Sequence, residues 1–336
     1  MKIHEKYIKR CIDLAKNGFP SAIPNPSVGA LLVIDNVIIA EGYTSAYGGN
    51  HAEVNVITYA KKHTPDLITK ATLYVTLEPC SHYGKTPPCA NLIIESGIQN
   101  VVIGTIDPHS KVAGNGVKKL LEAGVTVTVG VLEQACYEVN KRFFTYHEKK
   151  RPYIILKWAE TIDGYIAPLH RDRTAPVWIT NPYSRQLVHK WRSEEQAILV
   201  GAQTVLSDNP SLTTRDWEGD SPVRIVLDER DNLPKDAQIF NDQATTISIS
   251  SQDPKVIVDT LYKKELQSVL IEGGAKTIQQ FINARLWDEA RVFTGTIAFG
   301  EGTKAPLLSS TEKNIQQVST LLIKEDLLTI YKNKSS

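Results

Sequence analysis

The sequence predicts two α/β domains in succession. Its 336 residues exceed the ~250 to 300 residues at which single hydrophobic cores stop growing. Short apolar runs alternate with segments of helical spacing in both halves, which is typical of sheets covered by helices. The charged stretch FFTYHEKKRP, closed by Pro152, separates the halves. We therefore expect one domain over residues 1–146 and a second over residues 151–336.

The first half of the sequence predicts a helix, a β-hairpin and then alternating helices and strands. Apolar residues at helical spacing followed by Gly18 predict a helix over 5–18. GALLVI and VIIAEG flank the turn-forming pair Asp35 and Asn36, which predicts a β-hairpin. The remaining expected elements are a helix at 52–62, a strand at 72–77, a helix at 90–96 closed by Gly97, a strand at 101–106, a helix at 117–123 and a strand at 125–131.

The second half opens with an expected strand at 153–159. Further apolar runs follow, separated by helical or loop segments, at 197–202, 223–228, 245–250, 256–261 and 268–274. No internal repeat or low-complexity tract interrupts this pattern. A second α/β unit is the prediction.

Composition limits the function classes. Charged residues make up 22% and hydrophobic residues 42%, so a disordered or fibrous protein is excluded. Lys and Arg number 38 against 37 Asp and Glu, which gives no reason to expect nucleic acid as a partner. The N-terminus lacks the apolar run of a signal peptide, and no stretch approaches the ~18 apolar residues of a membrane span. We expect a cytoplasmic protein without a membrane partner.

The strongest motif in the sequence is typical of a catalytic zinc site. His51 and Glu53 form H-A-E, and Cys80 and Cys89 lie in PCSHYGKTPPC. One imidazole and two thiolates suit Zn²⁺, and three protein ligands leave the fourth position for water. A carboxylate that does not bind the metal is needed to move the proton, and Glu53 fits that role. The zinc-deaminase signature pairs H-x-E with P-C-x-x-C, whereas here eight residues separate the cysteines.

The spacing also predicts local geometry. Residues two apart on a regular helix point to different sides, so His51 should precede the first helical turn. Cys80 and Cys89 should lie at the entrance of the next helix, where the helix dipole favours thiolate. The alternative is a chance H-A-E with two buried cysteines. His82, between the cysteines, is either a fourth ligand of a closed site or a substrate contact, and its position favours the second.

These residues resemble a known family. PNPSVGALLV, HAEVNVI, VTLEPCSHYGKTPPC and DPHSKVAGNGVKKLLEAGV are similar to the deaminase half of the bifunctional riboflavin-biosynthesis deaminase-reductase. KWAETIDG, WIT, SRQLVHKWRS, ILVGAQTVLSDNPSLTTR, RIVLD and IEGGAKTIQQF resemble its reductase half. The resemblance implies a cytidine-deaminase-like α/β/α domain followed by a dihydrofolate-reductase-like α/β domain. It also implies zinc and NADPH as cofactors, and the family is often oligomeric.

The implied substrate is 2,5-diamino-6-ribosylamino-4(3H)-pyrimidinone 5′-phosphate. It loses its C2 amine by hydrolysis, and its ribosyl group is then reduced to ribityl by hydride from NADPH. Carried over by position, His51, Cys80 and Cys89 hold zinc, and Glu53 shuttles the proton. The implied substrate contacts in this half are Asn25, His82 and Lys85. Lys85 suits a phosphate dianion, although a solvated loop lysine is the alternative.

In the reductase half the resemblance assigns contacts to both ligands. The implied substrate contacts are Arg192, Asp208, Leu212, Arg215 and Glu272. The implied cofactor contacts are Ala159, Trp178, Thr204, Asp208 and Gly274, with Asp208 as proton donor or substrate orienter. Gly273 and Gly274 open a helix near Lys276, where backbone amides can bind a phosphate.

The reductase residues also have plainer interpretations. The two glycines would also suit an ordinary turn, and the arginines would also suit the surface. Asp208 would also suit the cap of a turn, and Trp178 would also suit the packed core. The sequence has no G-x-G-x-x-G fingerprint of a dinucleotide-binding unit. The prediction of a nicotinamide cofactor, and of NADPH in preference to NADH, therefore depends on the resemblance alone.

The sequence departs from the family at four positions. They are Thr44 for a histidine, His109 for an asparagine, Thr161 in TIDG for a serine, and Pro176 for a polar residue. Substrate affinity or identity is therefore less certain than the chemistry. One alternative is a paralogue that deaminates a different base or nucleotide. The other is a metal-stabilised binding module, against which the retained Glu53 argues.

Overall fold

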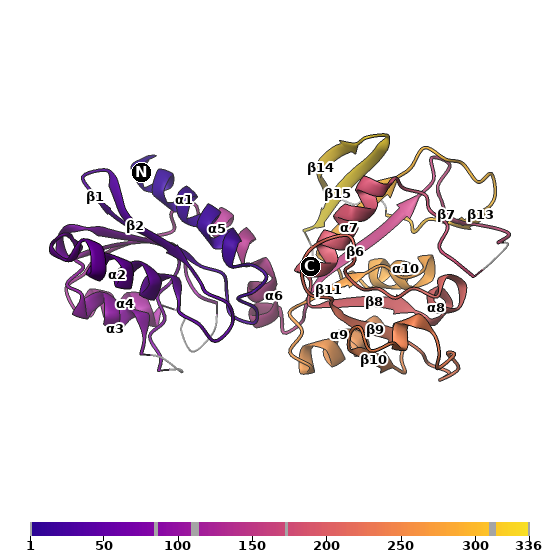
Figure 1. Ribbon diagram of the computed structural model, residues 1–336, viewed down its shortest axis with the longest axis horizontal. Helices are drawn as coiled ribbons and strands as arrows, with labels where there is room; N and C mark the ends of the chain where they lie inside the picture. Colours follow the sequence, from indigo (N-terminus) through magenta and orange to yellow (C-terminus); the bar gives the residue numbers. More distant parts are fainter. Residues whose placement is uncertain (1, 84–86, 109–113, 172–173, 309–313, 335–336) are drawn as a thin grey trace. The chain divides into compact units, whose positions relative to one another are not determined.

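The computed structural model describes residues 2–83, 87–108, 114–171, 174–308 and 314–334. Lys85 and His109 lie outside these residues. The chain divides into two compact units, Met1–Lys150 and Arg151–Ser336, each with its own sheet and core (Figure 1).

The first unit has a five-stranded sheet in the order β2-β1-β3-β4-β5. Its strands are β1 (Gly29–Ile34), β2 (Val37–Tyr43), β3 (Thr72–Leu77), β4 (Asn100–Thr105) and β5 (Thr126–Val129). β1 pairs antiparallel with β2 and β3, whereas β3, β4 and β5 are parallel. The carboxyl ends of β3 and β4 therefore lie at the same edge of the sheet.

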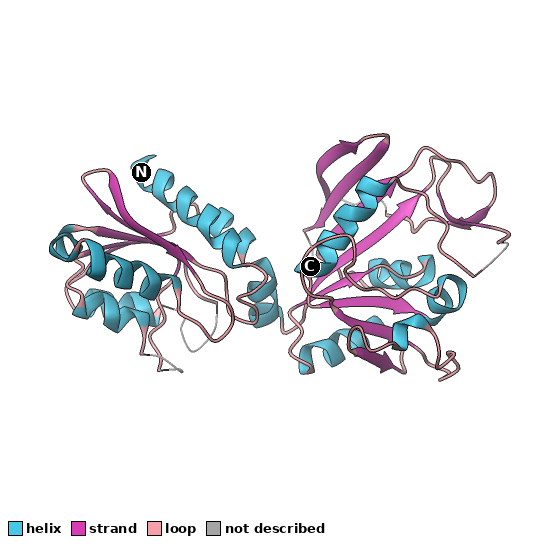
Figure 2. Ribbon diagram, viewed as in Figure 1, coloured by secondary structure: helices cyan, strands magenta, loops and turns pink. Residues whose placement is uncertain are grey.

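Helices cover both faces of this sheet (Figure 2). The helices are α1 (Lys2–Gly18), α2 (Ala52–His63), α3 (Cys89–Glu95), α4 (Asn115–Glu122), α5 (Glu133–Val139) and α6 (Lys141–Lys149), with a 3₁₀ helix η1 at Pro65–Lys70. Apolar residues of α2, α3 and α4 form one buried cluster with the strands. Residues of α1 and α5 form a second cluster on the other face.

The second unit has an eight-stranded sheet in the order β10-β9-β8-β11-β6-β12-β15-β14. Its strands are β6 (Tyr153–Glu160), β8 (Ala197–Gly201), β9 (Val223–Leu227), β10 (Thr246–Ile249), β11 (Ser268–Ile271), β12 (Glu289–Thr294), β14 (Ile315–Ile323) and β15 (Asp326–Asn333). The first six in spatial order are parallel, and β15 and β14 form an antiparallel hairpin at one edge. A small second sheet joins β7 (Tyr165–Pro168) to β13 (Gly302–Lys304).

Helices cover both faces of the parallel part of the large sheet. The helices are α7 (Pro182–Glu194), α8 (Ala202–Asp208), α9 (Pro254–Lys263) and α10 (Ala275–Asn283), with a 3₁₀ helix η2 at Gln238–Phe240. Residues of α9 and α10 pack in one cluster, and those of α7 and α8 pack in two others. Near-continuous burial along β6, β8 and β11 explains why these strands lack polar alternation.

The α/β prediction is confirmed for both units, with three corrections. The charged stretch expected to connect the domains is helical through Lys149, because Phe143 and Phe144 face the core of the first unit. The apolar run at 256–261 is helix α9 and not a strand, since Ile257, Val258 and Leu261 fall on one helical face. Strands β12 to β15 were not foreseen. β14 is largely exposed, so it carries little of the apolar alternation that marks a strand.

No helix in the described part of the chain is long and apolar enough to cross a membrane.

Candidate active sites

The three expected zinc ligands converge in the first unit. His51 is the residue before α2, with φ −69° and ψ 159°, so it precedes the first turn as predicted. Cys80 follows β3, and Cys89 is the first residue of α3. The cysteine prediction is therefore confirmed for Cys89, whereas Cys80 lies in the preceding loop and contacts that helix end.

The ligand atoms already have the spacing of a metal site. Nδ1 of His51 lies 3.3 Å from Sγ of Cys89 and 3.7 Å from Sγ of Cys80. All three ligand atoms lie within 4.8 Å of one another. Zinc bonds of about 2.1 Å to nitrogen and 2.3 Å to sulfur in a tetrahedron place such atoms about 3.6 Å apart. The residues therefore fit zinc, with Nδ1 as the imidazole ligand.

The thiols are polarised for metal binding. The backbone N–H of Cys89 donates to Sγ of Cys80 at 3.3 Å. Hydrogen bonds from Cys89, and then from His51, lower the pKa of the Cys80 thiol to about 4. The neighbouring Cys80 sulfur and burial raise the pKa of the Cys89 thiol. Both cysteines bind zinc as thiolates, so metal binding at this site releases protons.

Glu53 lies in the first turn of α2 beside these ligands and is 3% exposed. Burial raises the pKa of its carboxyl group to about 7. His82 is exposed and is not part of the ligand cluster found among the described residues. The cluster therefore has three ligands, as a catalytic zinc site does.

Two other first-unit residues singled out from the sequence are at least half-buried. Asn25 is half-buried and precedes β1. Thr44, at the position of an expected histidine, is 4% exposed. Its hydroxyl accepts the N–H of Val28 at 2.9 Å, so the side chain is engaged with the backbone of its own sheet.

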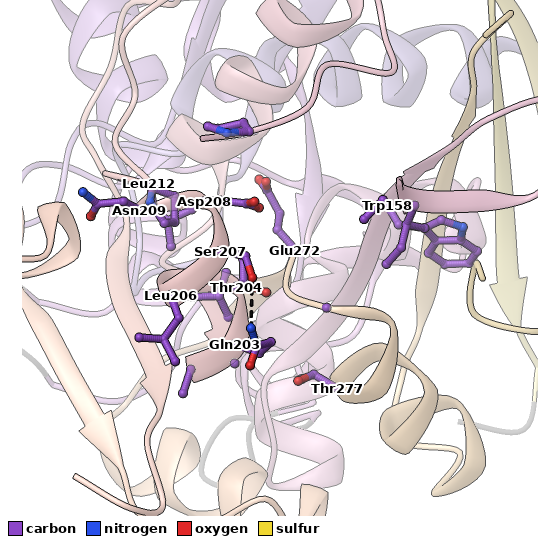
Figure 3. A pocket seen from close by; sticks show the side chains of 18 of the residues that line it. Trp158, Gln203, Thr204, Leu206, Ser207, Asp208, Asn209, Leu212, Glu272 and Thr277 are labelled. Atoms are coloured by element: carbon purple, nitrogen blue, oxygen red, sulfur yellow. Dashed lines mark hydrogen bonds between the residues drawn. The ribbon is translucent and has the colours of Figure 1, made fainter. Parts of the chain in front are cut away.

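The second unit contains a pocket of about 1060 Å³ beyond the carboxyl ends of its parallel strands. All nine ligand contacts that the resemblance implies for the reductase half line it, namely Ala159, Trp178, Arg192, Thr204, Asp208, Leu212, Arg215, Glu272 and Gly274. Its volume lies just above the ~300 to 1,000 Å³ usual for small-molecule and cofactor sites. Figure 3 shows Asp208, at the end of α8, and Glu272, after β11, among the side chains that line it.

A buried charge cluster forms part of this pocket. Arg192 donates to both carboxylate oxygens of Glu272, at 3.0 and 2.9 Å. Lys157 approaches the same carboxylate at 3.6 Å. Burial opposes the charge, but Arg192 and Lys157 outweigh it and lower the pKa of Glu272 to about 2. Sequence reasoning missed Lys157, although a lysine inside the otherwise apolar strand YIILKWA was a signal.

Two further polar pairs shape the pocket. Arg171 donates to the carboxylate of Asp208 and, at 3.4 Å, to the carbonyl of Ser207. The backbone N–H of Arg215 donates to Nδ1 of His189 at 3.1 Å. Burial, and then the charge of Arg192, lowers the pKa of His189 to about 4, so this imidazole is neutral at pH 7. Arg171 was also missed, because it lies outside the recognised motifs, whereas His189 lies within SRQLVHKWRS and was given no role.

The pocket has features that suit a dinucleotide phosphate. Gly274 has φ 41° and precedes α10, whose first residues line the pocket. A Cβ on Gly273 would lie 2.4 Å from Cα of Val200, so only glycine allows this close approach of β8. Trp178 is 56% exposed and stacks with Arg185 at 4.4 Å, so it is not a core residue. A flat exposed ring, a helix N-terminus and several cationic side chains fit NADPH.

The structure shows the surroundings of two positions at which the sequence departs from the family pattern. Thr161 is 1% exposed and its hydroxyl accepts the N–H of Tyr165 at 3.0 Å, a bond that a serine would also form. Pro176 lines the pocket without a polar side chain. Of these two departures, Pro176 is therefore the one that lies at the pocket.

The fold and the ligand cluster define the class of the first unit as a zinc-dependent deaminase. Residues 1–105 match the cytidine and deoxycytidylate deaminase zinc-binding region. Residues 152–329 match the RibD C-terminal domain. Both fold predictions are thereby confirmed, the second unit being the dihydrofolate-reductase-like domain of that family.

Proteins that are similar over nearly the whole chain support the same family. The riboflavin biosynthesis protein RibD of Aquifex aeolicus is 39% identical over 324 residues, covering 90% of this chain and 89% of its own. RibD of Bacillus amyloliquefaciens is 38% identical, covering 92% and 89%. The crystal structure of a diaminohydroxyphosphoribosylaminopyrimidine deaminase/5-amino-6-(5-phosphoribosylamino)uracil reductase from Thermotoga maritima matches with 40% identity, a TM-score of 0.90 and 99% coverage of both chains.

The chain therefore belongs to the RibD family. It is a bifunctional enzyme of riboflavin biosynthesis, with deaminase and reductase activities. Its cofactors are zinc in the first unit and NADPH in the second.

Proposed function

We propose that the chain deaminates 2,5-diamino-6-ribosylamino-4(3H)-pyrimidinone 5′-phosphate and then reduces the product to 5-amino-6-(5-phospho-ribitylamino)uracil. We assign the first step to residues 1–146 and the second to residues 151–336. The observation that carries this proposal is the preformed cluster of His51, Cys80 and Cys89 beside buried Glu53, in a chain whose other half has a cationic pocket.

In the first step the zinc ligands are His51, Cys80 and Cys89. Zinc held there supplies Lewis-acid activation of a water molecule. Glu53 takes a proton from the water that attacks C2 and delivers it to the amine, which leaves as ammonia. Asn25 and His82 contact the substrate, with Lys85 near its phosphate.

In the second step NADPH held in this pocket would supply a hydride to the ribosyl carbon that bears the nitrogen. The bond from that carbon to the ring oxygen would then break, and the oxygen would take up a proton. Asp208 orients the substrate or donates that proton, and Lys157 and Glu272 lie in the same pocket. The proposed substrate contacts are Arg192, Leu212, Arg215 and Glu272, and the proposed cofactor contacts are Ala159, Trp178, Thr204, Asp208 and Gly274.

We propose a small phosphorylated pyrimidine as the partner, with no nucleic acid and no membrane. The described cysteines are all free thiols, which favours a reducing cytoplasmic location. Association into a homo-oligomer stays a prediction from the family resemblance.

The test is one assay of the purified chain with the diaminopyrimidine ribosyl phosphate, following ammonia release and NADPH oxidation separately. We expect both signals, with NADPH oxidation dependent on prior deamination. The variant Glu53→Gln should retain zinc, release no ammonia and still oxidise NADPH when given the deaminated substrate. If zinc is bound but neither ammonia release nor NADPH oxidation is detected, the paralogue that acts on a different base or nucleotide would be favoured.

A further inference from the structure

A buried carboxylate lies next to the zinc ligands without being one of them. Glu78 follows β3 directly, two residues before Cys80, and is 3% exposed. Its backbone N–H donates to the carbonyl of Thr105 at 2.9 Å, at the end of β4. A charged side chain buried at this point needs several polar partners, because desolvating it alone would be costly.

Those partners are backbone amides at the two ends of the β4–α4 connection. Oε2 of Glu78 accepts the N–H of Asp107 at 3.3 Å and of Gly114 at 2.9 Å. Oε1 accepts the N–H of Gly116 at 2.8 Å and of Val117 at 3.1 Å. Hydrogen bonds to an ionised acceptor are stronger than neutral ones, and a carboxylate also suits the positive end of a helix. Glu78 thus occupies the N-terminus of α4.

The same short turn holds a zinc ligand. A Cβ on Gly116 would lie 2.0 Å from the carbonyl oxygen of Pro79, so the start of α4 lies directly against the Pro79–Cys80 peptide. On the other side, the carbonyl of Cys80 accepts the N–H of Ala90 in α3 at 3.1 Å. The turn is therefore fixed to α4 through Glu78 and to α3 through Cys80.

We propose that Glu78 is a positioning residue of the deaminase. It sets the place of Asp107 and of the first turn of α4 relative to the zinc ligand Cys80. Because β3 and β4 are parallel, both segments lie at the edge of the sheet where α/β proteins bind their ligands. Glu78 contributes no ligand atom, so it acts on the substrate through the segments it holds. This inference rests on the proposed deaminase function.

The test replaces Glu78→Gln. The amide keeps the shape, but it loses the charge and turns an NH₂ group towards backbone N–H donors. We expect the KM for the pyrimidine to rise at least about tenfold while kcat changes less than about threefold. Zinc content and NADPH oxidation with the deaminated substrate should stay unchanged. Glu78→Asp, which keeps the charge, should recover part of the KM. Glu95→Gln, an exposed carboxylate at the end of α3, is the matched control.

A second variant removes one donor and leaves Glu78 in place. Val117→Pro deletes an amide that Glu78 accepts, in the first turn of α4 where proline is tolerated. We expect a smaller rise in KM, about threefold, again with zinc retained. An unchanged KM in both variants overturns the proposal. If Glu78→Gln loses zinc, Val117→Pro decides: a raised KM supports the proposal and an unchanged KM overturns it.

Amide hydrogen exchange separates this inference from the proposed function. The amides of Gly114, Gly116 and Val117 should exchange slowly in the wild-type chain and at least about tenfold faster in Glu78→Gln. This measurement needs no substrate. If the wild-type chain releases no ammonia from the pyrimidine, the proposed function fails, and equal exchange in both proteins would overturn the role of Glu78 by itself.

Discussion

Removing the charge of Glu272 should destabilise the second unit by roughly 3 kcal/mol. The pKa of this carboxyl lies at about 2 instead of its ordinary 4.5, because Arg192 and Lys157 overcome the effect of burial. Each unit of pKa difference between folded and unfolded chain corresponds to about 1.4 kcal/mol, which gives the stated size for Glu272→Gln at pH 7. The side chains of Glu272 and Arg192 are 8% and 11% exposed, so solvent screens the pair weakly.

The contribution of Glu272 to the stability of the second unit should decrease at acidic pH. A lowered carboxyl pKa gives stability that is complete above the unfolded value near 4.5 and is lost as pH falls towards 2. The difference between wild type and Glu272→Gln should therefore be constant from pH 7 to about 5.5, and it should fall to about 1.5 kcal/mol at pH 3.

The assay is urea unfolding followed by tryptophan fluorescence. All five tryptophans lie in residues 151–336, so the signal reports the second unit alone. Glu218→Gln, an exposed position in the same unit, is the control and should change the unfolding free energy by less than about 0.5 kcal/mol. A difference below about 1 kcal/mol at pH 7, or one that stays constant down to pH 3, would refute the reasoning.

Three further outcomes are expected. Cys89→Ser should lower the zinc content from about one per chain to below ~0.2 and abolish ammonia release, with NADPH oxidation retained on deaminated substrate; full zinc content would contradict the ligand assignment. Asp208→Asn should lower kcat for NADPH oxidation by about a hundredfold or more while ammonia release is unchanged, and equal loss of both activities would argue against a role confined to reduction. His189, whose pKa is lowered to about 4, adds stability above its unfolded value near 6.5 that is lost as pH falls. Wild type should therefore lose roughly 2 kcal/mol relative to His189→Asn between pH 7 and 5 in the fluorescence assay, and parallel pH curves would show that the imidazole is not held neutral.

The sequence alone determined the local elements of the first unit. Alternating apolar runs and turn residues placed β1, β2 and β3 at the predicted residues, because side-chain periodicity and turn chemistry act over a few neighbours. The H-A-E motif and the two cysteines also predicted the zinc site, since few side chains bind this metal and their types are visible in the sequence. The strand β14 escaped this reasoning because it is largely exposed and carries little apolar alternation, and the helix α6 escaped it because its burial depends on partners far along the chain.

Only the tertiary structure decided how distant residues act together. Lys157, Arg192 and Glu272 come from three elements, and their shared charge cluster arises because β6, α7 and β11 pack around one pocket. In the sequence nothing distinguishes Glu78 from other acidic residues, yet its carboxylate accepts hydrogen bonds from backbone amides of a segment that starts 29 residues later. Electrostatic and hydrogen-bond partners are set by distance in space, which a linear pattern does not contain.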